Sequence, residues 1–444
     1  MLIVFIFCAF IVGAIPLIFL IRLMSRKHGS SIALLCPLSA FLVAYIILGF
    51  VRPLLYVNYN WSYDFTELDN DQYFLSLAII AICNYFMCLG YWYGTRKTKI
   101  LGTVTTQKQP ALILLGLAIL FMSIAYVHAA SNGIISGDFY ANRDAYLRAL
   151  QGSGYVSFFY IYPGLFLLWC YWVKGGRGYN YIIFLTLFGY IVLNVAVSNR
   201  SMLTIVLYGF FLVSQIKKYR DARVGAFKIF LALVGLVVLG VIVGLSRGVD
   251  NVDIDLNVTL LALNFLSATF DMQEMFAHVL STRSLHTFYY GGSWFQDVIL
   301  TYIPRAIFTF KPELYGSTLL EYEVLGRELS AIGLATFPLG IYGEGYLNFW
   351  YFGVIFVVFF TGYILGFLFS SILGHGMSGP TIYNFWPVFI YLATSANTLG
   401  YLRSFGQYIS GIIFSVGVFS LVVMCIWLWK SFFKYFNVRP RAAS

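Results

Sequence analysis

Charge is scarce in this sequence. Only 10% of its 444 residues are charged, whereas 60% are hydrophobic and 19% are aromatic. A water-soluble globule of this length would need far more charge on its surface, so the composition excludes one. We therefore predict an all-α polytopic integral membrane protein that forms a single domain over residues 1–444.

The sequence also shows no pattern of paired cysteines and no typical signal-peptide pattern. The six cysteines all fall inside predicted membrane spans and show neither a disulfide framework nor metal-ligand spacing. The first apolar run, Leu2 to Leu23, has no basic segment before it and precedes the basic residues at 26–28. This order favours a retained membrane span over a cleaved signal peptide.

Apolar runs long enough to cross about 30 Å of hydrocarbon recur along the chain. We expect about eleven spans, with the N-terminus outside and the C-terminus inside. They lie near residues 2–24, 31–55, 73–94, 110–130, 155–173, 180–198, 202–216, 229–246, 346–373, 382–398 and 408–429.

The distribution of charged residues supports this orientation. The segments placed inside, together with Arg22, hold 18 of the 28 Lys and Arg residues and 10 of the 11 lysines, as the positive-inside rule expects. Conversely, 17 of the 18 Asp and Glu residues fall outside, and only Asp221 falls inside. The two biases agree with each other.

Two of the predicted outer loops are long, at residues 131–153 and 247–345. The second contains the apolar stretch 258–270, but a span there would carry Asp271 and Glu274 into lipid. A carboxylate at mid-bilayer costs about 2.5 kcal/mol or more. We therefore expect an interfacial or re-entrant helix within the large loop.

Arginine dominates the basic residues on the outer side, where nine of ten are Arg. A guanidinium is favoured where a phosphate or carboxylate is held in a fixed geometry, although arginines at span ends also snorkel without any ligand. The bias favours an anionic ligand on the outer face. The ten residues are Arg52, Arg143, Arg148, Arg200, Arg247, Arg283, Arg305, Lys311, Arg327 and Arg403.

Some of these arginines are candidates for substrate binding by their position. Arg200, Arg247 and Arg403 each lie where a loop meets a predicted span, so they fit a cationic ring around a cavity mouth, and Arg327 lies in the large loop. Arg143 and Arg305 are each followed after ten residues by a glycine, in the two long outer loops. About 1.5 such matches are expected by chance, so their placement carries the signal.

On these features the sequence resembles the Wzy-type polymerases, which join lipid-linked oligosaccharide repeat units on the periplasmic side of the bacterial inner membrane. The resemblance rests on the many-span layout, the paired Arg-to-Gly spacing and the order of four stretches. These read "VSNRSMLTIV", "YIPRAIFTFKPELYGS", "IGLATFPLGIYGEGYLNFW" and "GYLRSFGQY". Their order is most similar to the oligosaccharide repeat-unit polymerases that include the enterobacterial common antigen polymerase.

The resemblance implies a GT-C-like glycosyltransferase architecture in the inner membrane, with a periplasmic active face. It implies undecaprenyl-diphosphate-linked oligosaccharide as substrate, membrane lipids, a chain-length regulator and a flippase as partners, and no nucleic acid. The related O-antigen ligases place a functional His in the large loop, but the residues around His278 and His286 do not match, so neither is assigned a role. Position by position, the resemblance points to Arg143, Arg200, Arg305, Lys311, Glu344 and Arg403.

The implied reaction needs charge stabilisation and positioning more than a strong acid, because diphosphate is already a good leaving group. We expect Arg305 to stabilise the diphosphate. Glu344, between two glycines, is a candidate to accept the hydroxyl proton, and a helix-start carboxylate is an equally good reading of it. The outer acidic stretches at 69–71 and 250–255 read as solvated loop, so we expect no cofactor and a metal-independent reaction.

Two other functions are compatible with the same composition. A lipid-linked oligosaccharide flippase or other transporter would also be basic and polytopic, but transport sites are expected near the bilayer midplane on charged or broken helices. The predicted spans are nearly free of charge, which favours an enzyme that faces outward. An O-antigen ligase would use the same donor with a different acceptor, and the sequence does not separate it from a polymerase.

Overall fold

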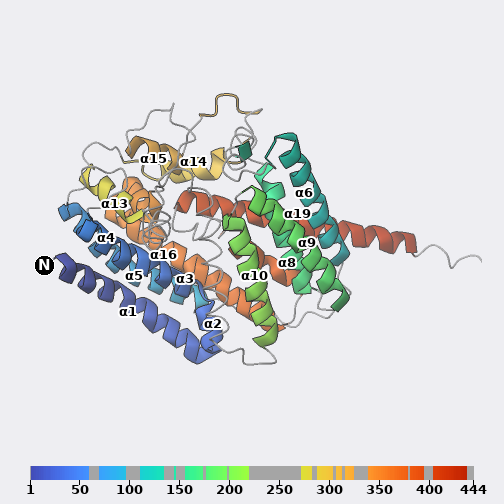
Figure 1. The fold of residues 1–444 in the computed structure, drawn as a ribbon, viewed down its shortest axis with the longest axis horizontal. Helices are drawn as coiled ribbons and strands as arrows, with labels where there is room; N and C mark the ends of the chain where they lie inside the picture. The colour runs from blue at the N-terminus through green and yellow to red at the C-terminus, as the bar shows by residue number, and fades with distance from the viewer. Residues whose placement is uncertain are drawn as a thin grey trace, which may run out of the picture.

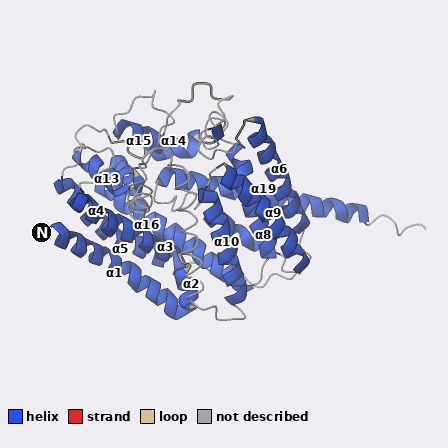
Figure 2. Ribbon diagram, viewed as in Figure 1, coloured by secondary structure: helices blue, strands red, loops and turns tan. Residues whose placement is uncertain are grey.

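The computed structural model describes residues 2–59, 70–96, 111–134, 145–146, 156–173, 177–197, 200–219, 272–282, 288–303, 307–312, 316–324, 339–378, 381–394 and 404–437. Within these ranges the chain is helical and contains no strand (Figure 2). Six helical stretches there are long and apolar enough to cross a membrane. The prediction of an α-helical membrane protein is confirmed.

The long helices coincide with predicted spans. They are α1 (Leu2–His28), the continuous series α3 (Pro37–Ile46), η1 (Ile47–Val51) and α4 (Arg52–Tyr59), α5 (Asn70–Arg96), α6 (Ala111–Ser131), α16 (Gly340–Ser378) and α19 (Phe405–Asn437).

Three shorter apolar helices, α8 (Ser157–Val173), α9 (Arg177–Ala196) and α10 (Arg200–Tyr219), match three further predicted spans. Only nine residues of the predicted span 382–398 form helix α17 (Trp386–Thr394), after the turn η6 (Tyr383–Phe385). The predicted span 229–246 and the apolar stretch 258–270 lie outside the described residues.

Helices α1, α3 and α5 pack side by side at the left of Figure 1. The ring of Phe5 contacts Phe74 near the starts of α1 and α5, and the Asn84 amide donates to the carbonyl of Gly13 further along both, so these helices are parallel. The Tyr45 hydroxyl of α3 donates to the carbonyl of Ala9, and α3 runs the opposite way. These relative directions are the ones that alternating membrane crossings require.

Helix α5 also packs closely along α16, and small residues make the approach possible. A Cβ on Gly90 would lie 2.0 Å from the carbonyl oxygen of Phe359, and a Cβ on Gly366 would lie 2.2 Å from that of Tyr91. Glycines four residues apart on both helices let two backbones touch, as in other membrane helix pairs. The four glycines are Gly90 and Gly94 on α5 and Gly362 and Gly366 on α16.

A second group of helices, α6, α8, α9, α10, α17 and α19, is joined by buried aromatic residues. Trp169 of α8 has no exposed surface, stacks between Phe385 and Phe419, and donates its indole N–H to the carbonyl of Ile382. The stacked pairs fix α8 against the turn before α17, residues 383–385, and against α19. Such pairs add about 0.5–1.5 kcal/mol beyond the burial of their area.

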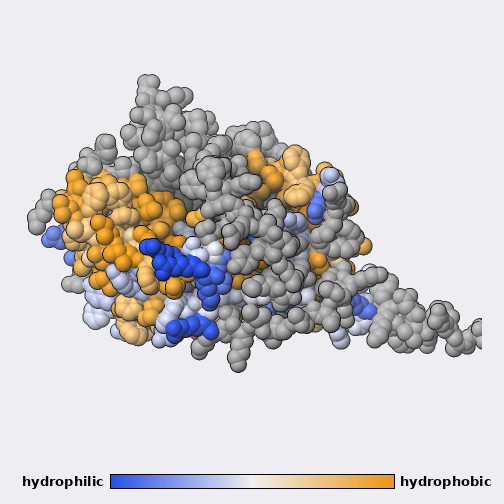
Figure 3. Space-filling view, turned by 90° about the horizontal axis from the view of Figure 1, so that it is seen from below, coloured by the Kyte–Doolittle hydropathy of each residue, from blue (hydrophilic) through white to orange (hydrophobic). Residues whose placement is uncertain are grey.

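The outer surface of the bundle is apolar, as lipid contact requires. On α9, Leu185 is 74% exposed and Phe188 is 64% exposed, and α1 and α19 expose similar residues. Figure 3 views the molecule from below and shows separate hydrophilic groups near the middle of this face, beside hydrophobic surface. Basic residues do end α1, at 26–28, and α5, at Arg96, on the side predicted to face inward.

Short helices from the predicted large outer loop lie together on the upper side in Figure 1. They are α13 (Met272–Ser281), α14 (Gly292–Leu300) and α15 (Gly316–Val324). They cover the ends of α5, α16 and α19, and this is where the polar side chains are buried.

Candidate functional site

Helix α16 folds back on itself near its start. Phe349 and Trp350 leave the helical conformation, and Trp350 has a φ of 58°. Gly345 lies four residues before Phe349 and Gly353 lies three residues after Trp350. The two glycines touch, because a Cβ on Gly353 would lie 2.0 Å from the carbonyl oxygen of Gly345. Residues 340–348 therefore form a short arm that packs against the long arm, residues 351–378.

The short arm is buried along its whole length, residues 340–348. Side chains hold the turn that ends it: the Trp350 indole N–H donates to the hydroxyl of Tyr346, and the Trp350 ring packs on Phe288. The sequence predicted that the span would begin at residue 346 with Glu344 in the preceding loop. The helix instead begins at Gly340, so Glu344 lies inside a buried helical arm.

The carboxylate of Glu344 binds the first turn of α19. Its two oxygens accept hydrogen bonds from the backbone N–H groups of Phe405 and Gly406, at 2.8 and 3.1 Å, and its side chain has no exposed surface. The first N–H groups of a helix have no partner within the helix, and a carboxylate there also interacts favourably with the helix dipole. Glu344 thus joins the short arm of α16 to the start of α19.

A second buried carboxylate, Asp297 of α14, lies beside the same turn. Its exposed fraction is 2%, and a Cβ on Gly406 would lie 2.4 Å from its Oδ2 atom. On its other side it packs on Gly316, which has a φ of 61° and where a Cβ would clash with Asp297 Oδ1. Gly316, the second glycine of the Arg-to-Gly spacing, is therefore required here for both space and backbone conformation.

The amide of Asn348 ties the short arm to α14. Its Oδ1 atom accepts hydrogen bonds from the Gly291 N–H and the Ser293 hydroxyl, and its Nδ2 atom donates to the carbonyl of Glu344. The starts of α14, α15 and α19 thus meet around the short arm. Glu344 was a candidate from the sequence, but Asn348 and Asp297 were not, because their contacts with other helices join positions that are distant in the chain.

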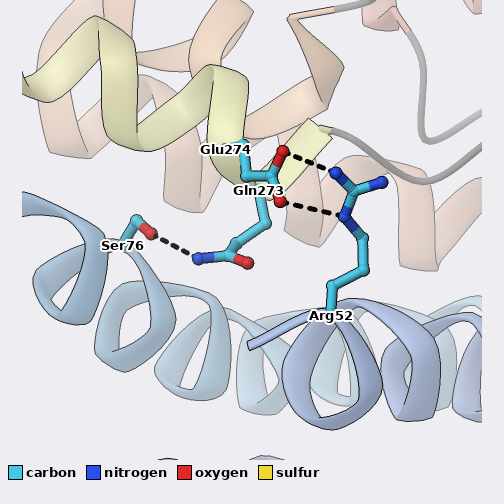
Figure 4. Close-up of polar contacts among 4 residues, drawn as sticks. All are labelled: Arg52, Ser76, Gln273 and Glu274. Atoms are coloured by element: carbon cyan, nitrogen blue, oxygen red, sulfur yellow. Dashed lines mark hydrogen bonds and ion pairs between the residues drawn. The ribbon is translucent and has the colours of Figure 1, made fainter. Parts of the chain in front are cut away.

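A separate polar cluster joins α13 to α4 and α5 (Figure 4). Arg52 donates to both oxygens of Glu274, from Nε at 3.0 Å and from Nη2 at 2.5 Å, and both side chains are at most 4% exposed. Beside them, the Gln273 amide donates to the hydroxyl of Ser76. The five residues before Arg52 form the π-helical turn η1, a distortion that is frequent at functional sites.

Two further buried polar atoms adjoin the ion pair. The hydroxyl of Tyr73 and the Oε1 atom of Gln273 meet hydrogen-bond geometry with no atom of the described residues. Burial raises the pKa of the Glu274 carboxyl, and the Arg52 guanidinium opposes that shift. The sequence placed Arg52 and Glu274 on the outer side, but it did not predict that they pair.

Only three of the eight predicted site residues lie in the described part of the chain. Arg200 is the first residue of α10, and Lys311 donates from Nζ to the carbonyl of Ile303 at 3.2 Å. The structure therefore brings Glu344 together with α14 and α19 but leaves the cationic ring a prediction. The other five candidates, Arg143, Arg247, Arg305, Arg327 and Arg403, lie outside the described residues.

No metal ion has an evident site in the described part of the chain, where no three His, Cys, Asp or Glu side chains lie close enough together to hold one. The acidic stretch 250–255 lies outside that part. In the described residues, the buried side chains of Glu344, Asp297 and Asn348 hold the starts of α14, α15 and α19 together. Arg403 directly precedes the start of α19 in the sequence. Comparison with models of protein families, with curated proteins and with solved structures finds no match to this chain.

Proposed function

We propose that this protein is a membrane glycosyltransferase that polymerises lipid-linked oligosaccharide repeat units. In the proposed reaction, the bond between the first sugar of the growing glycan and undecaprenyl diphosphate breaks. A glycosidic bond forms to a hydroxyl of the next lipid-linked unit, which loses its proton, and undecaprenyl diphosphate leaves. The proposed location is the bacterial inner membrane, with the reaction on the periplasmic face.

One observation carries the proposal. The polar groups buried around α13, α14 and the short arm gather where segments of the predicted large outer loop meet the ends of membrane helices. The surfaces of α1, α9 and α19 are apolar. A reaction between two lipid-linked substrates needs such an arrangement, in which fixed polar groups lie at one membrane face and the lipid tails stay in the bilayer.

The geometry of Glu344 favours a positioning role over a proton-accepting role. Both carboxylate oxygens are bonded to backbone N–H groups, and the side chain is fully buried. A general base must lie within hydrogen-bond reach of the proton that it accepts. We therefore propose that Glu344 fixes the start of α19, which follows Arg403 in the sequence, and that the arginines stabilise the diphosphate.

A transporter is the second candidate, and the folded-back α16 is the observation that favours it. Transporters often bind substrate at broken helices near the bilayer midplane. Residues 340–348 form a buried arm with two polar side chains, Glu344 and Asn348. Both side chains already bond to protein groups, so they offer less to a substrate than a transport site requires.

Purified protein in liposomes, supplied with one lipid-linked repeat unit, tests the proposal. A ladder of products supports a polymerase. Movement of the unit across the bilayer without a ladder would identify a transporter. When a lipid A-core acceptor is also added, transfer of a single block to it would identify a ligase. Arg26→Ala, at the other end of the bundle in the last turn of α1, is the matched control and should leave the ladder unchanged. Chelation by EDTA should leave it unchanged as well.

A further inference from the structure

Stability alone does not require the ion pair between Arg52 and Glu274. Two buried charges lose their hydration, and apolar side chains of similar size often stabilise a protein equally well or better. Arg52 nevertheless meets Glu274 through two hydrogen bonds (Figure 4). A two-point contact between a guanidinium and a carboxylate fixes orientation as well as distance. Apolar contacts do not supply such directionality, so the pair fixes how α13 lies on α4.

One side of α13 packs on the starts of α1 and α5. The Gln273 amide donates to the hydroxyl of Ser76, and Ala277 is buried in a cluster with Ile6 and Tyr73. Gln273 and Ala277 are four residues apart and therefore lie on the same face of the helix. This face and the ion pair together attach α13 to the membrane helices.

The other side of α13 packs on the short arm of α16, residues 340–348. The ring of Phe276 contacts the rings of Tyr342 and Tyr346, with centroids 6.1 and 6.3 Å apart. One turn earlier on the same face, Met272 lies against the start of the arm, because a Cβ on Gly340 would lie 2.8 Å from the Cβ of Met272. Helix α13 therefore contacts the arm from its first residue to Tyr346.

The same arm holds the start of α19. Glu344, between Tyr342 and Tyr346 in the sequence, accepts hydrogen bonds from the backbone N–H groups of Phe405 and Gly406. A continuous series of buried contacts thus runs from α4 through α13 and the short arm to the first turn of α19. A shift of α13 would displace the arm and, with it, the carboxylate that holds that turn.

We propose that Arg52 and Glu274 are positioning residues that act through α13 and the short arm to fix the start of α19. The inference rests on the proposed function, in which Arg403, directly before this helix, is a predicted substrate-binding residue. Neither member of the pair contacts substrate, because the two side chains are 4% and 1% exposed. Arg52 therefore has a different role from the anionic-ligand contact for which its position in the sequence made it a candidate.

The double variant Arg52→Met, Glu274→Leu tests this role, because it removes both buried charges and keeps large apolar side chains. Its thermal stability should be close to that of wild type. The kcat of polymerisation should fall about tenfold with the KM for the lipid-linked unit unchanged, as expected when a reacting group is displaced. A stable double variant with wild-type kcat would overturn the proposal. If it does not fold, Glu274→Gln, which keeps the size but not the charge, should show the same fall in kcat.

A matched control removes a polar contact far from this series. Tyr126→Phe deletes a hydrogen bond to the carbonyl of Gly189, between α6 and α9, and should leave kcat unchanged. An equal fall in kcat in this variant would contradict a specific role for the ion pair.

A nitroxide label at the start of α19 tests the proposal without an activity measurement. The exposed cysteines Cys8 and Cys425 are replaced by Ser, and Gln407→Cys, at an exposed position, is labelled. The label should be more mobile in the double variant than in wild type, and unchanged in Tyr126→Phe. Equal mobility in the double variant and wild type would overturn the coupling. Increased mobility in a protein whose wild type forms no ladder would instead contradict the proposed function alone.

Discussion

Arg52 and Glu274 form a two-point ion pair between positions that are 222 residues apart in the chain. The pair joins the end of the second long membrane helix to α13, the first described helix after the gap at 220–271. Both partners are buried in an environment that is otherwise mostly apolar. Removing one partner would leave the other charge buried and uncompensated.

We therefore expect Glu274→Ala to destabilise the protein by about 3–5 kcal/mol, the usual cost of breaking a buried ion pair on one side. The double variant Arg52→Met, Glu274→Leu should recover much of this loss, because it leaves no buried charge. Thermal unfolding in detergent measures both. Arg22→Gln, at an exposed position, is the control and should stay within about 0.5 kcal/mol of wild type. Equal stability of the Ala variant and wild type would contradict the buried pair.

The fold of α16 predicts that Gly353→Ala is strongly destabilising. The added methyl group would lie 2.0 Å from the carbonyl oxygen of Gly345, so the two arms would have to separate. Such overpacking typically costs about 1–3 kcal/mol. Gly417→Ala on α19, where a Cβ would contact nothing within 4 Å, should instead be neutral or slightly stabilising. Thermal unfolding of the two variants decides this, and similar midpoints would argue for a straight α16.

The packing of α13 on α15 should depend on pH through His278. Burial lowers the pKa of this half-buried imidazole below its usual 6.5, and its Nε2 atom lies 3.2 Å from the carbonyl oxygen of Val324. The unfolded chain therefore takes up this proton at a higher pH than the folded protein does. The free energy of unfolding should fall as the pH drops below 6.5, and this residue should contribute no slope at higher pH.

Unfolding of wild type and His278→Gln from about pH 7.5 to about pH 5 measures this contribution. The variant should lose part of the acid-side slope. An unchanged slope would show that other groups account for it.

Glu344 can be tested as a positioning residue through its conservative variant. Glu344→Gln keeps one oxygen that can accept from the start of α19, so we expect polymer yield to stay within about tenfold of wild type. Glu344→Ala should lose more activity and also about 0.5–2 kcal/mol of stability, the usual value for a lost helix cap. If Glu344 were the general base, Gln would reduce the rate about 100-fold or more without destabilising the protein.

Arg305 is the strongest candidate for stabilising the diphosphate. A charge-assisted contact contributes about 1.5–3 kcal/mol, so Arg305→Ala should slow polymerisation about 10- to 100-fold. Arg305→Lys keeps the charge but loses the planar fork of donors, so it should rescue only part of the activity. Polymer yield at matched membrane expression distinguishes the variants. Full rescue by Lys would indicate that Arg305 only anchors the loop, and a normal yield from Ala would end the proposal.

Hydropathy was enough to find the six described helical stretches that are long and apolar enough to cross a membrane, because each one is a local run of apolar residues. It could not find the reversal within α16. The residues before Phe349 include Glu344 and Asn348 and suit a loop, and the turn depends on contact between Gly345 and Gly353. Hydropathy analysis along the sequence detects the glycines but not the contact between them, and glycines are also common in loops.

The candidate site was predictable only in part, for a similar reason. Glu344 stood out because it is an acid next to a predicted span. Its actual partners, the N–H groups of Phe405 and Gly406, lie about 60 residues later in the chain. Arg52 and Glu274 were each visible as charges on the outer side, but nothing in the sequence pairs residues so far apart.

The glycine contact between α5 and α16 has a consequence for biosynthesis. Some 270 residues separate Gly90 from Gly362, so at about 5–20 residues per second the ribosome needs roughly 15–50 s to produce the second helix after the first. During that interval the glycine face of α5 has no α16 to pack against. Helix α1 is made earlier, and its contacts with α5 through Gly13 and Asn84 are available from the start. The α1–α5 pair is therefore the part of the molecule that must hold its place in the membrane while the rest of the chain is still being made.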